Sequence, residues 1–223
     1  MLAATERLGH VAAALQRIVA QYRAILAERN VALLLGAGIA SEIGDWFNTV
    51  ALISLSYRFS DSALGVGGMF AVRMLTRLLL QGPAGTMVDR HAGRRLLFAS
   101  QLVMAIVASS FVLLIPVPEL WLLYLLAILL EATNCLARPA FMVELKAEAP
   151  EEQRAAANGA LFASMTTAQL VGPLLGAVAL AWLGPAAVFA LNGLTFLGVA
   201  LAVAQLRGGL QVTRQNTEMQ INP

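Results

Sequence analysis

At residues 82–95 the sequence reads GPAGTMVDRHAGRR, and this stretch is the most informative about the fold of the chain. It follows one long apolar run and precedes another, so we expect a short, basic turn between two membrane helices. Gly85 and Asp89 are four residues apart and share one face of a helix end, where a small residue permits close approach of a neighbouring helix. Arg90, Arg94 and Arg95 are expected to hold this turn on the cytoplasmic side, by the positive-inside rule.

The composition is that of a membrane protein. The chain has 59% hydrophobic and 13% charged residues, whereas soluble proteins carry about 25% charged residues. Its pI of about 9.1 comes from basic residues placed between apolar runs, which indicates topology control rather than a nucleic-acid partner. The single cysteine Cys135 and the distant His10 and His91 offer no ligand cluster, so we expect no metal and no cofactor.

Six apolar runs are each long enough to cross a bilayer core about 30 Å thick. We place these transmembrane helices near 32–56, 64–82, 96–115, 120–138, 155–182 and 186–206. The connections at 57–63, 116–119 and 183–185 carry only Arg58 as a positive charge, whereas eleven other basic residues lie in the remaining connections and the tails. This asymmetry predicts an all-α membrane protein with six transmembrane helices and both termini in the cytoplasm.

The two ends of the chain are predicted to lie outside this bundle. In residues 1–31, apolar side chains recur every three or four positions with arginines off that stripe, which predicts a cytoplasmic amphipathic helix. It would either lie on the inner leaflet or pack on the cytoplasmic face of the bundle. Residues 207–223 are read as a polar cytoplasmic tail.

Two motifs give the chain a family resemblance. The stretch at 82–95 resembles the loop between helices 2 and 3 of the major facilitator superfamily, G-x-x-x-D-[RK]-x-G-[RK]-[RK]. Its matching residues are Gly85, Asp89, Arg90, Arg94 and Arg95, while Ala92 stands at the family glycine and Gly93 follows one residue later. The fifth run resembles the exporter motif G-x8-G-x3-G-P-x2-G-G at Gly159, Ala168, Gly172, Pro173 and Gly176, with Ala168 and Ala177 replacing two glycines.

The resemblance implies half of a twelve-helix transporter in the inner or plasma membrane. It looks most like the branch that exports drugs, macrolides and siderophores in exchange for protons. The partners would be the lipid bilayer, a small-molecule substrate, protons, and a complementary C-terminal half or a second copy of the chain. The resemblance also implies a conformational-switch network of Asp89, Arg90 and Arg94, and we expect Arg138 and Glu144, at the inner end of the fourth run, to be its partners. The alternative is that Arg90, Arg94 and Arg95 only fix the orientation of the chain in the membrane.

Five charged residues lie within the apolar runs: Glu42, Asp45, Arg73, Arg77 and Glu131. Each charge at the bilayer centre costs roughly 2.5–3.5 kcal/mol on insertion scales, so each needs a partner or water. An antiparallel turn centred near Ser60 puts Asp45 at the depth of Arg73, and Glu42 at the depth of Arg77. We therefore expect two ion pairs between the first two helices, serving either structure alone or proton coupling.

Two other classes of protein are considered. The chain could be a non-transporting remnant or an assembly subunit, since it supplies one half of a transporter fold. A membrane enzyme is disfavoured, because the sequence contains no G-x-S-x-G, H-E-x-x-H or G-x-x-x-x-G-K-[ST] motif.

Overall fold

The computed structural model of the chain describes residues 22–90 and 93–206, without the side chain of Asp89, and all secondary structure in this part is helical. Residues 22–27 are helical and precede five long helices. These are α2 (Arg29–Ser60), α3 (Ala63–Arg90), α4 (Gly93–Leu114), α5 (Leu120–Glu148) and α6 (Arg154–Ala204), with the short 3-10 helix η1 (Glu151–Gln153) before α6. Most of the predicted N-terminal surface helix and the whole polar tail lie outside the described residues.

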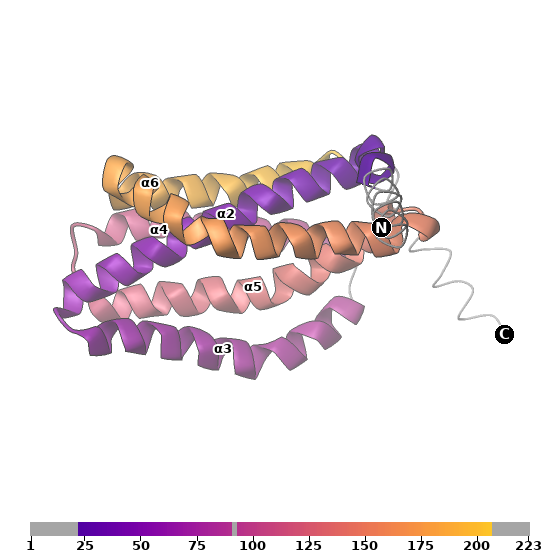
Figure 1. Cartoon of the computed structure of the whole chain (residues 1–223). Helices are drawn as coiled ribbons and strands as arrows, with labels where there is room; N and C mark the ends of the chain where they lie inside the picture. The colour runs from indigo at the N-terminus through magenta and orange to yellow at the C-terminus, as the bar shows by residue number, and fades with distance from the viewer. Residues whose placement is uncertain (1–21, 91–92, 207–223) are drawn as a thin grey trace, which may run out of the picture.

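The longest helix, α6, consists of two segments that meet at Gly184. This glycine has φ 76° and ψ 169°, a backbone conformation that costs glycine little and other residues much. Pro185 then begins the second segment, where its fixed φ suits a first helical position. Figure 1 shows the orange first segment and the yellow second segment running in opposite directions. The described residues therefore contain six long helical segments.

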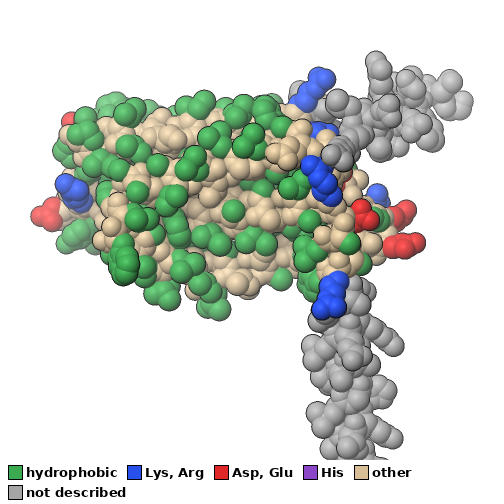
Figure 2. Space-filling model, turned by 90° about the horizontal axis from the view of Figure 1, so that it is seen from above, with side chains coloured by type: hydrophobic (Ala, Val, Ile, Leu, Met, Phe, Trp, Pro, Cys, Tyr) green, Lys and Arg blue, Asp and Glu red, His purple; other side chains and the backbone are tan. Residues whose placement is uncertain are grey.

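Four of the described helices are long and apolar enough to cross a membrane: Ala63–Val88, Gly93–Leu114, Leu120–Glu148 and Glu151–Ala204, of which the last includes both segments of α6. Helix α2 is not among them, and Glu42 and Asp45 interrupt its apolar run. On the face shown in Figure 2, charged side chains lie at the two ends of the bundle and hydrophobic side chains occupy the band between them. The surface is that of a bundle embedded in lipid.

Two stretches that the sequence assigned to loops are helical. Helix α3 continues through Pro83 to Arg90, and α5 continues through Pro139 to Glu148. The prediction of a loop over 83–95 is therefore wrong for residues 83–90 and 93–95, because membrane helices tolerate proline where neighbouring groups satisfy the freed carbonyls. Figure 1 shows that α3 bends toward its C-terminal end, as expected for an internal proline.

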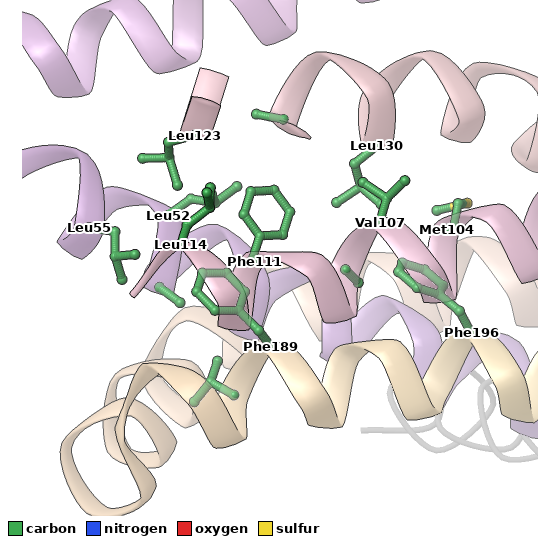
Figure 3. Close-up of a cluster of buried hydrophobic side chains, with 14 of the residues drawn as sticks. Leu52, Leu55, Met104, Val107, Phe111, Leu114, Leu123, Leu130, Phe189 and Phe196 are labelled. Atoms are coloured by element: carbon green, nitrogen blue, oxygen red, sulfur yellow. The ribbon is translucent and has the colours of Figure 1, made fainter. Parts of the chain in front are cut away.

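The core forms where α4 packs against both α5 and α6. Phe111 of α4 stacks on Phe189 of α6 with ring centroids 4.9 Å apart, and Leu52, Leu123 and Phe196 are fully buried around them (Figure 3). Offset aromatic pairs of this kind contribute about 0.5–1.5 kcal/mol beyond their burial. A second buried cluster lies toward the other end of the bundle and includes residues that flank α2, α5 and α6.

Candidate functional site

Charged side chains from three helices meet inside the bundle. They are Glu42 and Asp45 of α2, Arg73 and Arg77 of α3, and Glu131 and Arg138 of α5. On each helix the members are three, four or seven residues apart, so they share one helical face. The sequence predicted that five intramembrane charges would need partners, and the structure brings these five and Arg138 into one region.

Glu131 is the anchor of this cluster. Its carboxylate is 3% exposed and accepts hydrogen bonds from Arg73 and Arg77 of α3. Oε2 lies 3.0 Å from Arg73 Nε, and Oε1 lies 2.6 Å from Arg77 Nη2 and 2.9 Å from Arg77 Nε. Arg73 Nη1 also lies 3.4 Å from Thr49 Oγ1 of α2. Charge-assisted bonds of this length are among the stronger ones in proteins, so Glu131 ties α3 to α5.

The predicted ion pairs Asp45–Arg73 and Glu42–Arg77 are not formed. The depth rule behind them compared only α2 and α3, which are adjacent in sequence, but α3 packs more extensively on α5 than on α2. Both arginines therefore point to the carboxylate of α5. Glu42 instead pairs with Arg138, with Oε1 3.5 Å from Nη2.

Asp45 is the one acid of the cluster whose carboxylate has no ion pair or hydrogen bond to a described residue. Its backbone carbonyl accepts a bond from the Thr49 hydroxyl at 2.8 Å, which leaves the side chain unengaged. Arg73 and Arg77 share the carboxylate of Glu131. The negative and positive charges of the cluster are therefore equal in number only when Asp45 is ionised. A carboxylate within the membrane that has no partner among the described residues is a candidate position for a proton or a cationic ligand.

Two cavities open beside these charges. The first, of about 440 Å³, is lined by Glu42, Asp45, Arg73 and Arg77 together with apolar side chains that include Trp46, Phe70 and Met74. The second, of about 380 Å³, lies toward Gly85 and Pro139 and includes Glu131 and Phe162 in its wall. Arg77, Asn134, Arg138 and Met165 line both cavities, so the two form one polar cleft with an apolar wall. Such a lining suits an amphiphilic small molecule.

The fifth-run motif fixes the position of helix α2, which carries Glu42 and Asp45. A Cβ on Gly172 would lie 2.6 Å from Cγ of Trp46, and one on Gly176 would lie 3.3 Å from the backbone of Phe47. Only glycine allows this approach of α6 to α2. Ala168 is buried, Pro173 lies within the helix, and Gly159 is near Tyr22. This contact holds Trp46 in the cleft wall beside Asp45.

In the basic stretch 82–95, Arg94 has a different contact from the one that was expected. Arg94 donates to the carbonyl oxygens of Val203 and Leu206 at 2.9 and 2.6 Å, and so caps the C-terminal end of α6. Arg138 belongs to the charge cluster instead, and Glu144 is buried without an ion pair to a described residue. The switch network expected around Asp89 cannot be followed further, since its side chain lies outside the described part.

The remaining residues of this stretch lie at the surface. A Cβ on Gly85 would meet nothing within 4 Å, so the close approach predicted there does not occur within the described chain. Gly93 begins α4, where a Cβ would touch Val143 at 3.4 Å. Arg90 and Arg95 are exposed and have no hydrogen bond or ion pair to described residues.

Several cleft residues were missed from the sequence or given a lesser role. Thr49, Asn134 and Gln169 line the cleft, although none of them was assigned to a site from the sequence. The signal was available in their spacing, because Thr49 follows Asp45 by four residues and Asn134 follows Glu131 by three. Among the described residues, no three His, Cys, Asp or Glu side chains are grouped closely enough to hold a metal ion.

Comparison with known proteins agrees with this architecture. Residues 34–217 match the Major Facilitator Superfamily. Over 176 residues the chain is 27% identical to the "Uncharacterized MFS-type transporter YfiS" of Bacillus subtilis (strain 168), which covers 78% of this chain and 42% of that protein. The chain thus spans about two-fifths of the length of this relative, and no solved structure matches it significantly. The family match covers most of the chain, and the chain therefore belongs to the Major Facilitator Superfamily, as a multi-pass membrane protein of a transporter family.

Proposed function

We propose that the chain forms one six-helix wall of a proton-coupled exporter of drug-like or siderophore-like small molecules. In this proposal all six helical segments span the cell's inner or plasma membrane, and both termini lie in the cytoplasm. The cleft along α2, α3, α5 and α6 would carry the substrate. A complementary six-helix half would close the cleft, because its present wall is open on one side of the charge cluster.

The observation that carries the proposal is the unpaired carboxylate of Asp45 in a cleft whose other charges are paired. Protonation of Asp45 would add one positive charge beside Arg73 and favour loss of a cationic substrate. Deprotonation would do the reverse. The paired charges Glu131–Arg73–Arg77 and Glu42–Arg138 would hold the helices while Asp45 changes its charge. Exchange of proton for substrate at one carboxylate is the simplest form of antiport.

The test measures dye movement in membrane vesicles that contain the chain together with a C-terminal six-helix half. Asp45→Asn should abolish dye accumulation driven by an imposed proton gradient, while dye–dye exchange, which needs no proton, persists with weaker binding of a cationic dye because neutral Asn resembles protonated Asp45. The matched control is Asp61→Asn, which makes the same chemical change in the turn between α2 and α3. Asp61 caps α2 with φ 46°, a conformation that asparagine also tolerates. Gradient-driven accumulation by the Asp45→Asn protein would contradict the coupling role.

The chain alone is expected to be inactive in transport. Two copies facing each other would present the same charges across the axis, including two basic ends with Arg90 and Arg95 exposed. Transport is therefore expected only with the complementary half. Robust transport by a stable homodimer in liposomes would overturn this part of the proposal, and a chain without transport in either setting would favour the remnant or assembly role.

A further inference from the structure

A separate cavity of about 330 Å³ lies on the outside of the bundle, away from the polar cleft. It is lined by Arg94, Arg95 and Phe98 of α4 and by Val203 and Ala204 of α6. No residue of this cavity belongs to the charge cluster or lines the cleft. Its lining combines two guanidinium groups with three apolar side chains, at the end of the bundle where α3 and α5 also finish.

The cavity continues into apolar surface along both helices. On α4, Phe98, Leu102 and Ile106 are exposed at four-residue spacing and so share one face. On α6, Leu197 and Leu201 are exposed at the same spacing. The two helices pack against each other, and Arg94 bonds to the end of α6, so these stripes begin at the arginines and extend toward the membrane centre. A pair of acyl chains fits such a surface.

The charges at the cavity call for an anion. Arg95 has no hydrogen bond or ion pair to a described residue, and no carboxylate lines the cavity. Both arginines lie in the first turn of α4, where the positive end of the helix dipole makes further cations unfavourable and an anion favourable. Arg94 is held in place by the carbonyls of Val203 and Leu206, which orient it toward the same groove.

We propose that this cavity binds one anionic phospholipid, such as phosphatidylglycerol. Its phosphate would lie between Arg95 and Arg94 at the start of α4, and its acyl chains would follow Phe98 and Leu201 along the α4–α6 groove. Basic pockets between membrane helices bind anionic headgroups in this manner. The site would hold the α4–α6 end of the bundle in a fixed place against the lipid, independently of substrate transport.

The experiment is a native mass spectrometry titration of the purified, delipidated chain. Dioleoylphosphatidylglycerol is compared with dioleoylphosphatidylcholine, which has the same acyl chains and a zwitterionic headgroup. We expect one phosphatidylglycerol to bind in preference to phosphatidylcholine. Arg95→Gln should weaken this binding about fivefold, the effect of losing one arginine near an anionic headgroup. Arg90→Gln removes an exposed arginine at the C-terminal end of α3, at the same end of the bundle. This variant should bind phosphatidylglycerol as the wild type does.

A second pair of variants tests the apolar part of the site. Ala204→Trp should fill the cavity and lower phosphatidylglycerol binding without changing any charge, whereas Ala99→Trp, at an exposed α4 position outside the cavity, should not. Glycerol phosphate, which lacks acyl chains, should not displace the lipid at equal concentration. Equal binding of the two lipids, equal loss in the Arg90 and Arg95 variants, or displacement by glycerol phosphate would each overturn the proposal. Arg95 is exposed, so its variant should fold, and an unchanged melting temperature verifies this.

Discussion

The Glu131→Gln change removes the negative charge that lies between two guanidinium groups and keeps the size of the side chain. Glu131 is 3% exposed, while the side chains of Arg73 and Arg77 are 18% and 51% exposed. Breaking a buried ion pair by removal of one partner costs about 3–5 kcal/mol, but an exposed pair contributes only about 0–1 kcal/mol. Arg73 dominates the loss because it is the less exposed partner. We therefore expect Glu131→Gln to destabilise the fold by about 3 kcal/mol, at the low end of the buried range.

The single cysteine of the chain provides the assay. Cys135 is 8% exposed in the wall of the second cavity, one helical turn from Glu131 on α5, so a thiol-reactive fluorophore labels it faster once the bundle opens. For soluble proteins of about this length, 1 kcal/mol shifts the melting temperature by about 2–4 °C. On that scale Glu131→Gln should lower the labelling midpoint by roughly 6–12 °C. The double variant Arg73→Gln/Glu131→Gln should lose less than the sum of the two single losses, because the partners interact.

Asp45→Asn is the matched control, since it makes the same acid-to-amide change at a second intramembrane position. Asp45 has no ion pair to a described residue, so its variant should melt within a degree or two of the wild type, corresponding to less than about 0.5 kcal/mol. The reasoning fails if Asp45→Asn destabilises the chain as much as Glu131→Gln does. That result would restore the Asp45–Arg73 pair that the sequence suggested.

Two further predictions concern packing and capping. Gly172→Ala should destabilise the bundle by about 1–3 kcal/mol, because the new Cβ would lie 2.7 Å from the Cβ of Trp46, which no side-chain rotation can move. The control is Gly198→Ala in the same helix, whose new Cβ would meet nothing within 4 Å. This control should be neutral or stabilising in the same melting assay. Arg94→Gln should expose the last carbonyls of α6 and increase hydrogen exchange of the terminal turn by about five- to tenfold, as expected for a lost cap contributing about 1 kcal/mol, whereas Arg90→Gln should leave that exchange unchanged.

The order of the helical segments could be predicted because each apolar run indicates a helix independently of the other runs. A run of about 20 apolar residues must satisfy its backbone internally in lipid, whatever its neighbours are. The helix ends predicted near Pro83 and Pro139 were wrong for the same reason. Pro83 and Pro139 would end a helix in water, but in these long helices the chain continues for seven and nine residues beyond them.

The pairing of charges could not be predicted from sequence order. Glu42, Asp45, Arg73, Arg77 and Glu131 were all recognised as buried charges in need of partners. Which partner each one finds depends on which helices touch, and α3 rests on α5 across a gap of 54 residues between Arg77 and Glu131. Patterns within one helix carry no information on that contact. The Gly172–Trp46 contact could not be predicted for the same reason. The sequence indicates a small residue at position 172, but it does not show that the side chain of Trp46 packs against it.

The arrangement of charges separates the residues that hold the bundle from the one residue left able to change. Glu131 ties α3 to α5 and Glu42 pairs with Arg138, so these acids stabilise helix contacts only while they stay ionised. Asp45 has no such contact, and its helix is held instead by the glycine packing of Gly172 against Trp46. A proton can therefore bind Asp45 without breaking an ion pair that supports the fold. This division is what the proposed exchange of protons for substrate requires, because a coupling acid that also held two helices together would loosen the bundle at each protonation.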